Sequence, residues 1–175
     1  MVAFPAHFIV AADIEWPWVK SLIPEGDFGA PLGPPFLRAL EQRLHLAAGS
    51  TDAVLLAGPL AGPPPIDLTP IRNSGHPRVR RARRYRTDLR VWTTGSGVLI
   101  MGRGLAGRWE VAVEVQDGAR NRGLGRALAS AARHLVPDGR PVWGQVAPGN
   151  AASLRAFLAA GYLPVGAETL LTPRL

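Results

Sequence analysis

The chain of 175 residues contains no cysteine, a single lysine (Lys20) and no long apolar run. Without cysteine it can form no disulfide, no thiolate metal site and no cysteine nucleophile. No apolar stretch approaches the roughly 18 residues that a membrane-spanning helix needs. The first residues lack the basic segment of a signal peptide, and Asp13 and Glu15 soon interrupt the first apolar patch. These absences predict a cytoplasmic protein without a membrane partner.

Arginine supplies almost all of the positive charge, and the formal net charge is +7. Such a balance is compatible with nucleic acid, an anionic surface or a phosphorylated small molecule as a partner. Arginine in place of lysine, in a chain with so much Ala, Gly and Pro, is also the composition that a GC-rich genome produces. We favour this compositional explanation over a functional one.

The chain divides at about residue 50 into two predicted parts. Residues 1–50 predict an N-terminal extension that is irregular, apart from a helix over 36–48 that Gly49 closes. Residues 51–175 predict a mixed α/β domain, because short apolar strands alternate with amphipathic helices. The expected strands are 52–58, 89–94, 97–103, 108–115, 141–147 and 166–172, and the expected helices are 76–86, 123–136 and 150–161.

Two glycine-rich segments compete as binding sites for an anionic ligand. Residues 102–107, GRGLAG, match the G-x-G-x-x-G pattern of dinucleotide-binding proteins, but they lead into a strand, whereas that pattern opens a helix. We interpret them as a hairpin turn. Residues 119–128, ARNRGLGRAL, do lie between a strand and a helix, where glycines and helix-start amides can surround an anion.

The second segment resembles the acetyl-CoA motif R-x-x-G-x-G of the GNAT superfamily of N-acetyltransferases. Arg120, Gly123 and Gly125 stand at the motif positions. Residues 150–162, NAASLRAFLAAGY, resemble that superfamily's element N-x-x-A-x-x-x-Y-x-x-x-G-F. The resemblance covers roughly residues 89–172. It implies a mostly antiparallel, splayed sheet flanked by helices, with acetyl-CoA as the acyl donor.

The resemblance also implies which residues bind acetyl-CoA. Backbone groups at the end of the strand 108–115 would pair with the pantetheine arm, and amides of residues 120–126 would surround the pyrophosphate. Asn150 would reach the cofactor from the second helix, although a plain N-cap explains it equally well. The implied cofactor-binding residues are Val113, Glu114, Val115, Arg120, Asn121, Arg122, Gly123, Leu124, Gly125, Arg126, Asn150, Ser153 and Phe157.

Catalysis needs a base for the amine and benefits from an acid for the leaving thiolate. Phe157 stands where the family often has a tyrosine as that acid, and phenylalanine cannot donate a proton. A thiol of pKa about 8.5 still leaves without help, so the loss slows the reaction without forbidding it. Glu110 and Glu114 share one strand face and are the predicted bases, the alternative being ordinary ion-paired glutamates. His76 and Asp88 are unranked candidates, and no histidine spacing predicts a metal.

Residues 76–90 carry seven arginines. We favour a solvated amphipathic helix with Val79, Ala82 and Tyr85 inward. An acidic acceptor or partner ranks second and nucleic acid third.

The sequence therefore predicts an acetyl-CoA-dependent N-acetyltransferase, in which the amine attacks the thioester directly in a ternary complex. A non-catalytic acyl-CoA-binding regulatory module and a nucleic-acid-binding protein are the alternatives. The acceptor, a small-molecule or protein amine, stays open, as does a homodimer.

Overall fold

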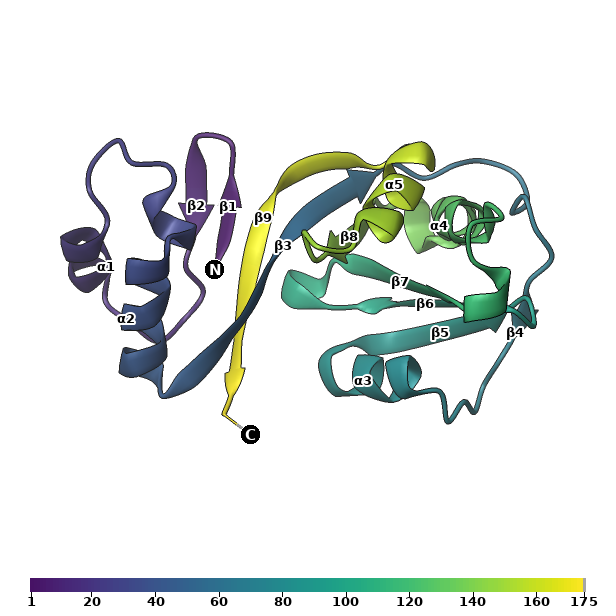
Figure 1. Cartoon of the computed structure of the whole chain (residues 1–175), viewed down its shortest axis with the longest axis horizontal. Coiled ribbons are helices and arrows are strands. Elements are labelled where there is room, and N and C mark those ends of the chain that lie inside the picture. Colours follow the sequence, from purple (N-terminus) through teal and green to yellow (C-terminus); the bar gives the residue numbers. More distant parts are fainter. Residues whose placement is uncertain (175) are drawn as a thin grey trace. The chain divides into compact units, whose positions relative to one another are not determined.

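The structure, a computed structural model, describes residues 1–174 and contains two compact units (Figure 1). One unit comprises residues 1–54 together with the chain from Val165 on, and the other comprises residues 55–164. The described residues form nine strands and five α-helices, and the strand pairs are mostly antiparallel. The predicted α/β class is therefore confirmed. No helix in residues 1–174 has the length and apolar character that crossing a membrane requires.

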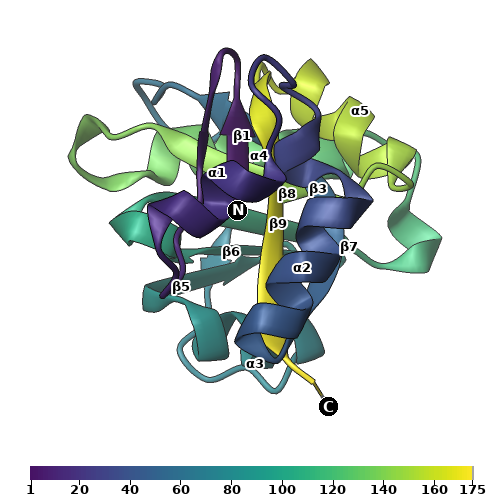
Figure 2. The same ribbon diagram turned by 90° about the vertical axis from the view of Figure 1, so that its left-hand side faces the viewer.

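The first unit combines a small sheet with two helices, which face the viewer in Figure 2. Its strands follow the order β2-β1-β9-β3, and β1 pairs antiparallel with both β2 and β9. Its core lies around Val19, Phe36 and Leu40. The elements are β1 (Val2–Phe4), β2 (His7–Ile9), α1 (Trp16–Leu22), α2 (Pro34–Leu44), and most of β3 (Leu46–Ala57) and β9 (Leu163–Pro173).

Two features of this unit differ from the sequence prediction. The helix predicted over 36–48 ends at Leu44, because His45 adopts a left-handed conformation (φ 55°, ψ 34°) and closes α2. Leu46–Ala48 then begin β3, so the prediction that Gly49 closes the helix is wrong. The strands β1 and β2 also form in a segment that the sequence left irregular.

The second unit has a sheet of strand order β8-β7-β6-β5-β4. α3 packs on one face of this sheet, and α4 and α5 pack on the other (Figure 1). Every element predicted here forms, with ends that differ by a few residues. The elements are β4 (Thr69–Pro70), α3 (Pro77–Tyr85), β5 (Thr87–Thr93), β6 (Gly97–Arg103), β7 (Trp109–Val115), α4 (Leu124–Leu135), β8 (Val142–Val146) and α5 (Ala151–Ala159).

Residues 102–107 confirm the predicted hairpin turn, since they join the antiparallel pair β6 and β7. The N–H of Gly104 donates to the carbonyl of Arg108 at 3.0 Å. A Cβ at Gly104 would collide with the carboxylate of Glu110, so a larger residue in this turn requires that carboxylate to move.

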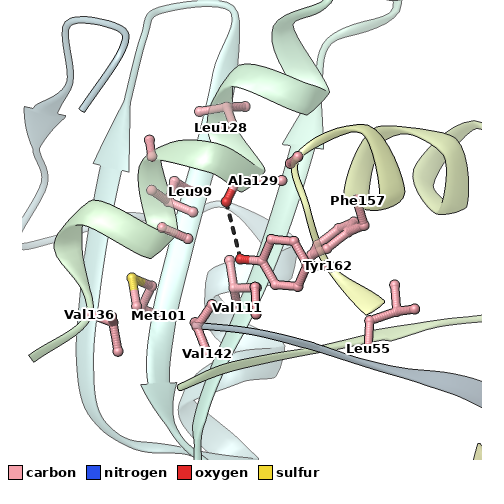
Figure 3. Close-up of a cluster of buried hydrophobic side chains, with 14 of the residues drawn as sticks. Leu55, Leu99, Met101, Val111, Leu128, Ala129, Val136, Val142, Phe157 and Tyr162 are labelled. Atoms are coloured by element: carbon pink, nitrogen blue, oxygen red, sulfur yellow. Dashed lines mark hydrogen bonds between the residues drawn. The ribbon is translucent and has the colours of Figure 1, made fainter. Parts of the chain in front are cut away.

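The larger core lies between the sheet and the helices α4 and α5 (Figure 3). Leu99 and Leu128 are completely buried in it. The Tyr162 hydroxyl donates to the carbonyl of Ala129 at 3.1 Å, which satisfies a polar group deep in apolar surroundings. Burial raises the pKa of Tyr162 above its usual range. Tyr162 is therefore part of the larger core.

Candidate functional site

The parallel strands β7 and β8 are paired over only part of their length. The register joins Trp109–Val111 to Val142–Gly144 and ends there. β7 nevertheless continues to Val115 and β8 to Val146, while β7 stays paired with β6 throughout. The backbone of residues 113–115 therefore has no partner from β8 in the described structure. A free strand edge of this kind can pair with an extended ligand.

The turn that follows β7 presents a row of free backbone amides. Within residues 1–174, the N–H groups of residues 121–126 donate no hydrogen bond, and no side chain caps α4. Asn121 (φ 60°) and Gly123 (φ 81°) adopt left-handed conformations. A Cβ on Gly123 would meet no atom within 4 Å, so the space before it is open. Consecutive free amides at a helix start favour an anionic ligand.

The arginines of this turn have different surroundings. The Nε of Arg120 donates to the carbonyl of Val115 at 3.4 Å, and its Nη2 forms an ion pair with Oδ1 of Asp117 at 2.8 Å. Arg120 therefore connects the end of β7 to the turn. Arg122 and Arg126 are exposed and have no ion pair in residues 1–174. These two guanidiniums are available to an anion that the amides bind.

The two motif glycines have different surroundings. Gly123 faces open space, whereas a Cβ on Gly125 would lie 3.5 Å from Ala156 and 3.9 Å from Val115. Gly125 thus lies against α5 and β7, where a Cβ would make ordinary van der Waals contact. Leu124, between them, is half-buried and packs against the core.

The second motif is built around helix α5. The Oδ1 of Asn150 accepts the backbone N–H of Ser153 at 3.1 Å, which confirms the predicted N-cap. Phe157 is only 3% exposed, and its ring packs edge-on against the ring of Tyr162, with 4.8 Å between the ring centroids. A Cβ on Gly144 would lie 2.8 Å from the Phe157 ring. Phe157 therefore fills the core beside the last paired residue of β8.

Glu110 is buried and held by two arginines. Its Oε2 accepts from the Nε of Arg86 at 2.9 Å, and its Oε1 accepts from the Nε of Arg108 at 2.8 Å. The N–H of Leu105 lies 3.3 Å from the same Oε1. Burial lowers the pKa of Arg86, and the charge of Glu110 opposes that change. Both oxygens of Glu110 are thus occupied, as in the ion-paired alternative.

Glu114, on the same face of β7, is more accessible, with 39% of its side chain exposed. The Nε of Arg78 donates to its Oε2 at 2.6 Å, and the Nε2 of His76 lies 3.8 Å from its Oε1. The hydrogen bond from Arg78 lowers the pKa of Glu114. The structure therefore places His76 next to a predicted base, at the start of α3.

Sequence reasoning missed this contact between α3 and β7. It named His76 and Glu114 separately, but it assigned no role to Arg78. The single available signal was the position of His76 just before a helix, where its Nδ1 accepts the N–H of Arg78 at 3.2 Å. Asp88, the other unranked candidate, pairs with Arg103 at 3.3 Å.

The described residues contain no group of three or more His, Asp or Glu side chains that could hold a metal ion. Comparisons with protein-family models, with curated proteins and with solved structures find no match for this chain. Three features of the described residues remain as the basis for a proposed function. They are the free strand edge at residues 113–115, the free amides of residues 121–126 and the accessible Glu114.

Proposed function

We propose that this chain is an acetyl-CoA-dependent N-acetyltransferase with a GNAT-like fold. The observation that carries the proposal is the parting of β7 and β8 beside the amide row of residues 121–126. β7 leads directly into that row, so one extended ligand can pair with the strand edge at residues 113–115 and place its anionic end at the amides. Acetyl-CoA has this combination of an amide-rich arm and a pyrophosphate.

The residues of the turn fit a pyrophosphate in charge and in space. The free N–H groups supply donors, and Arg122 and Arg126 supply charge without carboxylate partners. The open space at Gly123 allows close approach of the backbone. Asn150 and Ser153 lie at the start of α5. Phe157, on the same helix, is buried and packs α5 against the core.

Acetyl-CoA supplies an acetyl thioester. As the amine forms the new C–N bond, the C–S bond breaks and sulfur leaves with the electron pair. Backbone N–H groups of residues 113–115 would stabilise the developing oxyanion. No acyl-enzyme is expected, because the chain has no cysteine and its sequence shows no recognisable serine triad.

Of the two predicted bases, Glu114 has the better access to an amine, since Arg86 and Arg108 occupy the oxygens of Glu110. The lowered pKa of Glu114 weakens it as a base. On the ground of its access, we expect Glu114 to take the proton of the amine directly or through water. Because Glu114 is a weak base, the rate should rise with pH toward the pKa of the amine itself.

A non-catalytic acyl-CoA-binding module is the second candidate. It is favoured by Phe157, which is buried in the core and cannot protonate a thiolate. Such a module would bind acetyl-CoA through the same strand edge and amides without transferring the acetyl group.

Two measurements test these candidates. Calorimetric titration should show that the chain binds acetyl-CoA, and that acetyl-pantetheine binds on the order of 100-fold more weakly because it lacks the pyrophosphate. Equal affinities for the two ligands would contradict the site at residues 121–126. Release of free thiol in the presence of an amine panel then separates the enzyme from the binding module, which should release none.

A further inference from the structure

Helix α3 carries more positive charge than the composition of the chain explains. Five of its nine residues are arginine. The whole chain has 20 basic residues in 175, so a nine-residue segment holds about one on average. Residues 68–87, which include α3, contain no aspartate or glutamate. The cluster is therefore a local feature.

Three of these arginines form an exposed face without acidic partners. Val79 and Ala82 are buried and attach α3 to the sheet, which turns Arg80, Arg81 and Arg84 to solvent. These three side chains make no ion pair or hydrogen bond in residues 1–174. Their spacings of three and four residues place like charges side by side, which destabilises a helix. We call Arg80, Arg81 and Arg84 the arginine face.

The arginine face starts one helical turn from Glu114. Arg78, which donates to Glu114 at 2.6 Å, lies three residues before Arg81 on α3. Residues three apart are neighbours on a helix surface. A molecule lying along α3 would therefore reach Glu114 at the first turn of the helix.

We propose that the arginine face docks an acidic polypeptide segment and thereby delivers a nearby amine of that segment to Glu114. This inference rests on the proposed acetyl transfer. Guanidinium groups form strong paired hydrogen bonds with carboxylates, and an anionic partner removes the repulsion among the three arginines. A polycationic amine is repelled by the same face.

The chemistry of the acceptor separates an acidic polypeptide from a nucleic acid. Both could neutralise the arginine face. The amino groups of nucleobases are poor nucleophiles, because their lone pairs are delocalised into the ring. A lysine or an N-terminal amine becomes a good nucleophile once it has lost its proton. The acidic polypeptide therefore satisfies both the arginine face and Glu114.

The binding test uses the full chain without acetyl-CoA, at low salt. The probe is a fluorescein-labelled peptide with four glutamates and one lysine, and the comparison probes are its glutamine counterpart and an eight-nucleotide oligouridylate. Fluorescence anisotropy should show that the acidic peptide binds most tightly and that added salt weakens it. Tighter binding of the oligouridylate, or equal binding of the glutamine peptide, would overturn the proposal.

Variants locate the bound peptide. Changing Arg80, Arg81 and Arg84 together to glutamine should weaken binding of the acidic peptide by on the order of tenfold, since exposed ion pairs are individually weak. Changing the same residues to lysine should keep most of the affinity. A control triple glutamine variant at the exposed Arg38, Arg140 and Arg155 removes the same charge elsewhere, and should change affinity less than about twofold. Equal losses in the two glutamine variants would overturn the proposal.

Acetyl transfer to the same peptides distinguishes the two levels of inference. Docking predicts a kcat/KM for the acidic peptide about tenfold above that of its glutamine counterpart, with the difference lost in the arginine-face variant. Equal values for the two peptides would overturn the docking and leave the acetyl transfer standing. Binding at the arginine face without thiol release from any amine would overturn the acetyl transfer and leave an acidic docking surface.

Discussion

The two faces of the sheet in the second unit differ although the same strands build both. On the α4 and α5 side, Val111, Val113 and Val115 of β7 pack into the larger core. On the α3 side, Ala112 contacts a smaller core, while Glu110 and Glu114 form ion pairs. The packed face is thus apolar along β7 and buries the larger core, whereas the charged face combines a smaller apolar core with ion pairs.

This difference suggests a division of labour in the proposed enzyme. The packed face fixes the start of α4, where Gly125 approaches Ala156, and so fixes the amides that would bind the donor. The charged face carries the accessible Glu114 and the arginine face, which would receive the acceptor. Variants on the two faces should therefore affect different steps.

Gly123→Val should have the largest effect, on the donor side. Valine is strained at the φ of 81° and its side chain would fill the open space before the amides, so we expect affinity for acetyl-CoA to fall at least on the order of 1000-fold. Gly139→Val is the matched control, because Gly139 also has a left-handed φ (61°) and open surroundings but lies outside the turn. Calorimetric titration with a folded Gly123→Val protein of unchanged affinity would reject the site.

Leu128→Ala tests the packed face through stability. Leu128 is completely buried in the larger core, so its truncation should lower the free energy of unfolding by about 2–5 kcal/mol. Val79→Ala, which truncates a completely buried residue under α3, should cost less, because fewer methyl groups are removed. Denaturant unfolding of both variants checks the comparison, and a larger loss for Val79→Ala would reverse it.

Replacement of both Glu110 and Glu114 by glutamine should slow acetyl transfer at neutral pH by on the order of 100-fold, because no carboxylate base remains. The two single variants should differ in what they change. Glu114→Gln should carry the loss of rate, whereas Glu110→Gln should chiefly lower stability, since Arg86 and Arg108 lose a buried partner. A double variant with the unmodified rate across the pH range would reject both bases but leave the transferase proposal intact.

Tyr162→Phe should lower stability by about 1 kcal/mol at neutral pH, because the hydrogen bond to Ala129 is lost. Its effect should shrink in alkali. Burial raises the pKa of Tyr162 in the folded state, so above pH of about 10 the unfolded state releases the proton first and stability falls as pH rises. The phenylalanine variant lacks this alkaline loss. Parallel unfolding curves for the two proteins from neutral to alkaline pH would contradict the explanation.

Phe157→Tyr should have the smallest effect on rate, neutral or mildly activating. The ring lies in the core beside Gly144, so an added hydroxyl gains access to the thiolate only if it reaches the gap between β7 and β8. Thiol-release kinetics should therefore stay within about tenfold of the unmodified chain, below the usual gain from a well-placed acid. A larger activation would show that residue 157 occupies the position of the missing acid.

Sequence patterns predicted the second unit well because its elements are locally determined. Alternating apolar residues define β7, and Asn150 and Gly161 delimit α5. Such local patterns could not predict contacts between residues that are far apart in the sequence. The burial of Glu110 depends on Arg86, which is 24 residues away in the sequence.

Local conformation also limited the prediction. The end of α2 is set by the left-handed His45, which outweighed the more obvious signal of Gly49. The prediction that Tyr85 faces inward with Val79 and Ala82 is wrong, since Tyr85 is the last residue of α3 and is 61% exposed. The phenol ring of Tyr85 is therefore part of the surface next to Arg84.

The contact between Gly104 and Glu110 has a consequence for how the sequence can change. The carboxylate of Glu110 occupies the volume that a side chain at position 104 would need. A side chain at 104 therefore has to displace this carboxylate from Arg86 and Arg108, and a smaller residue at 110 removes that cost and leaves a space that the new side chain can fill. The two positions are expected to covary among descendants of this chain, although one lies in a turn and the other in a strand.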